Sequence, residues 1–220
     1  MRSRSLQIAF NLAILTLLVP SAMAQVSVKA TSTAIIAQNG PKQGGTSLRY
    51  FNVEGKDKGK YSCYGLVQFD AKSMLAAIKK ASPNGTAKLK QVRLDLVQSI
   101  ASFSASGSVR VYYVPGAPDP KSLKYPFNLD QTAKAKALAD LKFTVAAAAK
   151  SSSRAPHATA IVDKCVLSAT VNANDLERVL ASSPVLTLAL VETSPGVAAT
   201  WAGKAHQSLP PPTLVLTLAK

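Results

Sequence analysis

The chain has 220 residues, with 26 lysines and arginines against 11 acidic residues, which gives a formal net charge of +15. Hydrophobic residues make up 47% of the sequence and charged residues 17%, so the chain can build a folded core and is not disordered by composition. Two cysteines and two histidines argue against a scaffold with several disulfides and against a zinc cluster of Cys and His.

The first 24 residues have the pattern of a secretory signal peptide. A basic start is followed by an apolar run over residues 8–19, and Ala22-Met23-Ala24 supplies the small side chains of a signal-peptidase site. An uncleaved membrane anchor is the alternative, but about 12 apolar residues are too few to cross a hydrocarbon core about 30 Å thick. We therefore expect an exported protein, with residues 1–24 as the signal peptide and residues 25–220 as one soluble domain.

Polar and apolar residues alternate in short segments along the rest of the chain, which is the pattern of half-buried β-strands. We expect strands over residues 26–28, 33–37, 47–53, 62–69, 92–97, 109–114, 158–171, 185–192, 197–202 and 213–218. Helical spacing or a capping box marks three further segments, residues 70–81, 131–141 and 174–182. So many strands with long crossings predict an all-β fold, a jelly-roll-like antiparallel β-sandwich with one or two short helices.

Two of these strands predict a specific register. Residues 92–97 and 109–114 alternate cleanly and are joined by the loop 99–107, so we expect them to pair with each other. One register satisfies both faces at once, which a slip by one residue would not. Its pairs are Leu94 with Val111 and Leu96 with Val109 on the inner face, and Arg93 with Tyr112 and Asp95 with Arg110 on the outer face.

The two cysteines are expected to form a disulfide. Cys63 and Cys165 each alternate with apolar residues of a strand, so both side chains are expected to face the core. Thiols of exported proteins tend to oxidise, and a Cys63–Cys165 bridge would join two sheets. Closing a loop of about 100 residues would stabilise the fold by about 4–5 kcal/mol. Two separate buried thiols are the alternative.

Catalytic patterns do not emerge from the sequence. The Gly-x-Ser-x-Gly elbow of many hydrolases is absent, and no pair of carboxylates is placed for glycoside hydrolysis. Both histidines lie in polar loop segments. We expect no metal and no cofactor, and the chain is not expected to be an enzyme. A polysaccharide lyase, which can use Tyr, Arg and Lys, remains an alternative.

The outer face of the expected strand pair is the first candidate for ligand binding. An aromatic ring can pack on a sugar ring, while an Arg guanidinium donates paired hydrogen bonds to a carboxylate or sulfate. The alternative is that the same side chains pair with each other, as Asp95 with Arg110. The candidate residues are Arg93, Arg110 and Tyr112 on this pair, with Tyr64 and Gln68 on a neighbouring segment.

The excess of basic residues gives a second candidate. Lys56, Lys58 and Lys60 crowd one turn, and such charge attracts polyanions. Nucleic acid is not expected as the biological partner because the protein is expected to be exported. An anionic polysaccharide or cell-surface polymer fits that location better. The alternative is a solvated surface that keeps the protein soluble.

Four stretches resemble the DNRLRE-type domain, which is related to family 96 carbohydrate-binding modules. They are Gly44-Gly45-Thr46-Ser47-Leu48-Arg49, Tyr64-Gly65-Leu66-Val67-Gln68-Phe69-Asp70, the alternating strand Leu89 to Leu96, and Pro210-Pro211-Pro212-Thr213-Leu214-Val215-Leu216. The resemblance implies a jelly-roll-like sandwich, an extracellular location, and glycan binding in some members. It assigns no ligand residue to this chain.

The sequence therefore predicts a secreted, non-catalytic module that binds glycan. A structural protein of an envelope, matrix or coat, without a discrete ligand site, is the first alternative. A polysaccharide lyase or hydrolase is the second.

Overall fold

A computed structural model describes residues 24–42, 49–84, 88–99, 104–129, 135–145, 161–167 and 182–219. The strands are β1 (Ala24–Lys29), β2 (Ser32–Ala37), β3 (Gly40–Lys42), β4 (Tyr50–Glu54), β5 (Cys63–Asp70), β6 (Lys88–Val97), β7 (Gly107–Val114), β8 (Lys136–Phe143), β9 (Val162–Val166), β10 (Val185–Glu192), β11 (Ala198–Ala202) and β12 (Thr213–Ala219). The helix α2 (Ala71–Ala81) and the 3₁₀ turns η1 (Lys56–Tyr61) and η2 (Pro120–Ser122) connect some of them.

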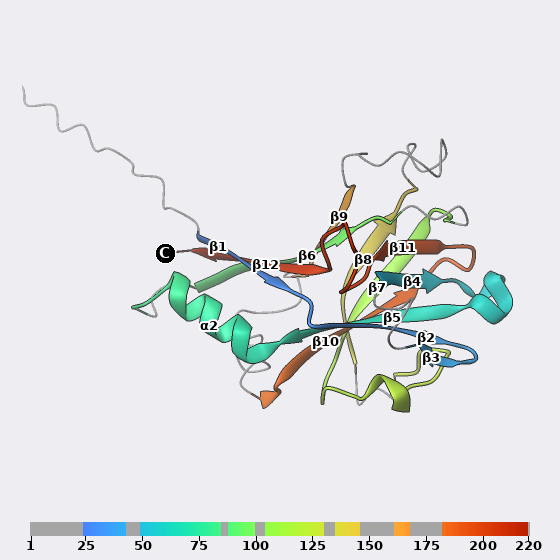
Figure 1. Ribbon diagram of the computed structural model, residues 1–220, viewed down its shortest axis with the longest axis horizontal. Helices are drawn as coiled ribbons and strands as arrows, with labels where there is room; N and C mark the ends of the chain where they lie inside the picture. Colours follow the sequence, from blue (N-terminus) through green and yellow to red (C-terminus); the bar gives the residue numbers. More distant parts are fainter. Residues whose placement is uncertain are drawn as a thin grey trace, which may run out of the picture.

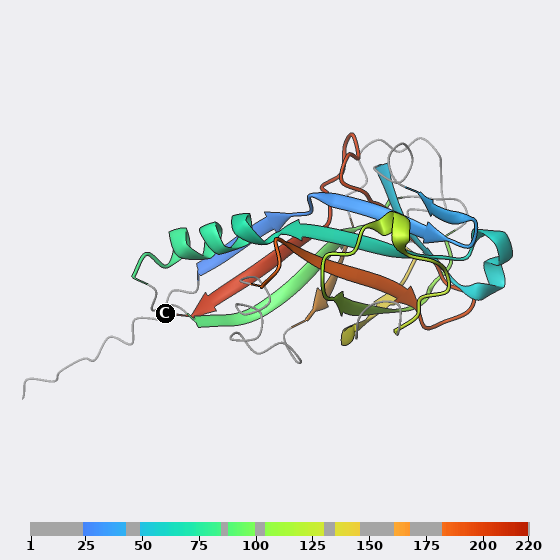
Figure 2. The same ribbon diagram turned by 90° about the horizontal axis from the view of Figure 1, so that it is seen from below.

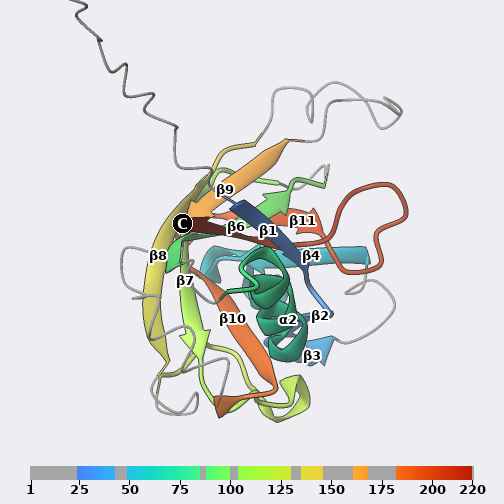
Figure 3. The same ribbon diagram turned by 90° about the vertical axis from the view of Figure 1, so that its left-hand side faces the viewer.

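The strands form two antiparallel sheets that pack as a sandwich, as Figure 1 and the end view in Figure 3 show. A four-stranded sheet has the order β1-β12-β6-β9. The second sheet has the order β11-β4-β5-β10-β7-β8, and β2, which also pairs with β3, adds to β5. This architecture confirms the antiparallel β-sandwich with a short helix that the alternating sequence predicts.

The core lies between the two sheets and follows the alternation of their strands. In β12, Leu214, Leu216 and Leu218 are buried in it, as are Val92, Leu94 and Leu96 of β6. The helix α2 covers one end of the sandwich and adds Ala71 and Met74 to the same core (Figure 3). Asp70 caps this helix by accepting a 2.6 Å hydrogen bond from the backbone N–H of Ser73.

A partly buried hydrogen-bond network joins the two sheets at Trp201. Trp201 of β11 is completely buried, and its Nε1 donates to Oδ2 of Asp163 in β9 at 2.7 Å. The side-chain amide of Gln98 donates to both oxygens of Asp163, at 2.9 and 3.0 Å. Burial raises the pKa of Asp163 above its ordinary value, although these hydrogen bonds act in the opposite direction. A carboxyl group of one sheet thus satisfies the indole of the other.

The predicted pairing of β6 with β7 is wrong. β6 pairs with β12 and β9, whereas β7 pairs with β10 and β8 in the other sheet. The loop between them crosses from one sheet to the other, where Gln98 and Ala105 each form a bridge to β11. Alternation fixes which side of a strand faces the core, but any antiparallel neighbour satisfies it equally well.

The predicted Cys63–Cys165 disulfide is also wrong, because the two cysteines are buried far apart and no disulfide joins them. Cys63 begins β5 beside η1 and packs with Ile35 and Ala37. Cys165 lies in β9, opposite Leu94, within the main core. Both side chains are buried as expected, but they occupy different parts of the sandwich.

The helix predicted over residues 131–141 is a strand where the structure describes it. Residues 136–143 form β8, which pairs with β7 through a register shift between Val111 and Tyr112. This irregularity leaves Leu138 and Leu141 both buried. Their spacing of three residues imitates the period of a helix.

Parts of the prediction lie outside the described residues. These are the signal peptide up to residue 23, residues 44–48, 131–134, 158–160 and 168–171, and the helix over residues 174–182 except Ser182. Cleavage after Ala24 would remove the first residue of β1 and keep its pairing with β12 from Gln25 opposite Thr217 onward. None of the described helices has the length and apolar character needed to cross a membrane.

Gly65 of β5 is expected to tolerate no side chain. A β-carbon there would overlap the ring of Phe51, which is completely buried. We expect Gly65→Ala to lower the free energy of unfolding by about 1–3 kcal/mol in a urea titration, because the core must shift to accept it. Gly196→Ala is the matched control, since the nearest atom to its β-carbon would be Oδ2 of Asp57 at 4.0 Å. Equal effects of the two substitutions would contradict this packing.

Asp163→Asn tests the half-buried carboxyl group beside Trp201. A folded-state pKa above the unfolded value means that the folded protein binds the proton more tightly. The free energy of unfolding of the wild type should therefore rise relative to the variant as the pH falls from neutral through the folded-state pKa. The rise is complete below the ordinary aspartate pKa of about 3.9. Urea titrations of both proteins across this range measure it, and a difference that does not change with pH would refute the assignment.

Candidate functional site

Arg93 does not share a face with Tyr112, as the predicted register required. It lies on the outer side of the four-stranded sheet, between Val215 and Val166. Its guanidinium forms a paired interaction with Asp95 on the same strand, with Nε to Oδ1 at 2.6 Å and Nη2 to Oδ2 at 2.9 Å. The Nε–Nη2 edge of the guanidinium, which could bind an anion through paired hydrogen bonds, is therefore already used within the strand.

Arg110 has a different acidic partner from the one predicted. Its Nε and Nη2 donate to the two carboxylate oxygens of Asp140, at 2.6 and 3.0 Å. Asp140 lies directly opposite on β8 and has a pKa below its ordinary value, because the guanidinium of Arg110 stabilises its charge. The predicted Asp95–Arg110 pair is thus replaced by two separate pairs, one in each sheet.

The other three candidates lie beneath the chain that follows β7. Tyr64 is buried, and its hydroxyl donates to the carbonyl of Lys124 at 3.3 Å. Gln68 donates to the carbonyl of Pro118 at 3.4 Å. The ring of Tyr112 packs against Phe127 with centroids 4.9 Å apart. These side chains hold the segment 115–129 on the sheet.

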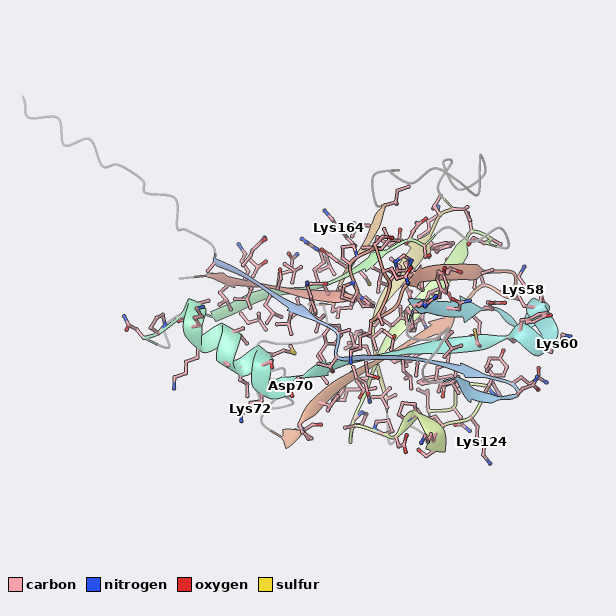
Figure 4. The ribbon with its side chains drawn as sticks, in the orientation of Figure 1. Lys58, Lys60, Asp70, Lys72, Lys124 and Lys164 are labelled. Carbon is pink, nitrogen blue, oxygen red and sulfur yellow. The ribbon has the colours of Figure 1, made fainter. Side chains whose placement is uncertain are left out.

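The described lysine-rich turn, η1, presents a ring and positive charges together. Tyr61 is 60% exposed, the largest exposed fraction among the large hydrophobic side chains that the structure describes. The Nζ of Lys60 lies 5.2 Å from the centroid of its ring. Lys56 is exposed and Lys58 half-buried on the same turn. We call η1 with these four side chains, Lys56, Lys58, Lys60 and Tyr61, the tip, and Figure 4 shows Lys58 and Lys60 at that end of the molecule.

Backbone hydrogen bonds fix the tip to the loop before β11. Gly55 donates to the carbonyl of Val197 at 2.8 Å, and Asp57 donates to the carbonyl of Pro195 at 3.0 Å. A β-carbon on Gly55 would overlap that Pro195 carbonyl, so the close approach requires glycine. The buried hydroxyl of Ser62 closes the turn by donating to the carbonyl of Gly55 at 3.0 Å. The tip is therefore held in place before any ligand arrives.

This arrangement suits an anionic sugar chain. An exposed tyrosine ring offers a flat apolar face, while lysine ammonium groups act as point charges for carboxylate or sulfate. Asp57 is the one acidic residue of the turn, so the net charge of the turn remains positive. The attraction between such exposed charges and a polymer weakens with salt, since screening sets in beyond about 8 Å at physiological ionic strength.

The three lysines of the tip are visible in the sequence as a candidate, whereas the role of Tyr61 is not. Tyr61 precedes a strand, where an aromatic residue is usually part of the core. The sequence signal for its exposure is its position between Lys60 and Ser62. Ser62 closes the turn by donating its backbone N–H to the carbonyl of Gly59. Comparison with known proteins adds no relative, since no family model and no curated protein sequence matches the chain.

Proposed function

We propose that this chain is a secreted, non-catalytic β-sandwich module that binds an anionic polysaccharide or cell-surface polymer through the tip. The observation that carries the proposal is the exposed Tyr61 ring with the ammonium group of Lys60 5.2 Å from its centroid. This pair combines the apolar contact that a sugar ring needs with the charge that a uronate or sulfate needs.

The rigidity of the tip supports the same proposal. A mobile loop must become ordered when it binds a ligand, and the entropy lost in this ordering weakens the affinity. The anchored backbone of Gly55 and Asp57 reduces that entropic cost. The excess of positive charge, +15 on the whole chain and 24 − 11 = +13 without Arg2 and Arg4 of the expected signal peptide, would speed encounter with a polyanion.

Kinship with the DNRLRE-type domain is part of the proposal. Two of the stretches that resemble this family lie at strands of the sandwich. Tyr64–Asp70 is part of β5, which leads directly into helix α2. The proline-led stretch at 210–216 leads into β12. The sandwich fold is consistent with this kinship. The proposed glycan binding is the activity that the resemblance implies for some members of the family.

Substitution of the tip lysines tests the proposed function. We expect Lys56→Ala/Lys58→Ala/Lys60→Ala to weaken binding to alginate, a linear polyuronate, by about tenfold, or about 1.4 kcal/mol. Tyr61→Ala alone should also weaken binding, because the sugar loses its apolar platform. Calorimetry or a binding sensor at fixed salt, with the mature protein, measures both.

A matched control removes the same charge from the other end of the molecule. Lys72, Lys79 and Lys80 are exposed on α2, and Figure 2 shows α2 and η1 at opposite ends of the long axis. Lys72→Ala/Lys79→Ala/Lys80→Ala should leave alginate binding nearly unchanged. Equal losses from the two triple variants would mean that only bulk charge matters, and the tip would not be a site.

Three further probes separate the alternatives. Neutral dextran should not bind, and polyglutamate should bind more weakly than alginate because it offers no sugar ring to Tyr61. Binding to all polyanions alike, or to none, would favour a structural protein without a discrete ligand site. Release of reducing or unsaturated ends from the polysaccharide would show an enzyme instead.

A further inference from the structure

A second group of exposed aromatic and basic side chains lies at the other end of β4. The turn after β11 folds back onto the start of β4, where Gly203 donates to the carbonyl of Arg49 at 2.7 Å. This places the ring of His206 edge-on against the ring of Tyr50, with centroids 5.6 Å apart. Tyr50 remains 37% exposed. Arg49 and Lys204 are exposed beside them.

The imidazole of His206 is held as a hydrogen-bond donor. Its Nδ1 accepts the backbone N–H groups of Ser208, at 3.2 Å, and Leu209, at 3.0 Å. A nitrogen that accepts two hydrogen bonds carries no proton, so the proton of the neutral ring lies on Nε2. Partial burial and the positive charge of Arg49 both lower the pKa of His206, which keeps the ring neutral at pH 7.

The positive charges of Arg49 and Lys204 form no ion pair within the described part of the chain. The ion pairs found there are Arg93–Asp95 and Arg110–Asp140, and neither Arg49 nor Lys204 takes part in them. The group therefore offers an aromatic ring, two cations and a neutral N–H donor. Such a set recognises a carboxylate or sulfate attached to a sugar ring.

We propose that Arg49, Tyr50, Lys204 and His206 form a second subsite for the same anionic polysaccharide, so that one polymer chain binds along β4 from this subsite to the tip. The proposal rests on the proposed function of the tip. β4 starts at Tyr50 and ends at Glu54, just before η1. Its length is about 13 Å at 3.3 Å per residue, which a chain of several sugar units can span.

The side chains along β4 set which part of the polymer lies over it. Tyr50, Asn52 and Glu54 alternate with the buried Phe51 and Val53, so they share the outer side of the strand. Asn52 donates to Oε1 of Glu54 at 3.3 Å. Because Glu54 repels anions, the charged groups of the polymer lie at the two ends, and neutral hydroxyl groups lie between them. Binding at both ends raises the affinity for long chains above that for short ones.

Arg49→Ala/Tyr50→Ala in the mature protein tests the subsite, with long alginate and alginate di- and trisaccharides as probes. We expect the affinity for long alginate to fall about tenfold. The affinity for the short fragments should change much less, because the tip still binds them. His206→Asn, whose side-chain oxygen can replace Nδ1 in the turn, should reproduce part of the loss by removing the Nε2 donor.

The matched control is Lys72→Ala/Leu75→Ala on α2. It removes one cation and one apolar side chain that, like Tyr50, is 37% exposed, and it should leave both affinities unchanged. If the triple lysine variant of the tip loses affinity for long alginate and Arg49→Ala/Tyr50→Ala does not, the subsite is overturned and the proposed function of the tip stands. If neither variant loses affinity for long alginate, both the proposed function of the tip and the subsite are overturned. If the double variant does not fold, Arg49→Gln decides: it keeps Tyr50, and an unchanged affinity for long alginate would overturn the subsite.

Discussion

The buried indole of Trp201 is the constraint on which the joining of the two sheets depends. An N–H group removed from water must find an acceptor inside the protein, and here the acceptor is the carboxylate of Asp163 in the opposite sheet. That carboxylate is costly to bury, so it needs the further donation from Gln98. The ring of Trp201 packs against Phe51 and Phe143, with centroids 5.8 and 5.5 Å apart. The hydrogen bond to Asp163 therefore ties β9 to β11, while the ring contacts pack Trp201 against β4 and β8 of its own sheet.

The alternation of the sequence identified most of the strands, though not β3 or β8, and the buried sides of those that it identified. Leu94 and Val111 are both completely buried, as predicted, although they belong to different sheets. What alternation lacks is information about neighbours, because one apolar face fits against many others. The irregular pairing of β7 with β8 shows a second limit. It places Leu138 and Leu141 on the buried side three residues apart, and local spacing alone cannot distinguish this from a helix.

The candidate site was predictable to the extent that it rests on charge. Three lysines in one turn are visible in the sequence, and the structure keeps them together on η1. The exposure of Tyr61 depends on hydrogen bonds between η1 and a loop more than a hundred residues away in the sequence. Tyr64 and Gln68 face outward as predicted, but the segment 115–129 covers them, because Leu123 and Phe127 pack on that side of the sheet. Exposure is a property of the whole chain rather than of a strand.

The helix α2 and the end of β12 lie at the same end of the long axis, away from the tip (Figure 2). A tether attached after Ala219 would therefore leave the tip pointing outward. Molecules anchored in this way on a bead or a sensor would all present the same surface to the solution. Their orientation would be uniform, and neighbouring copies could bind one long polymer at several points at once, which is multivalent binding.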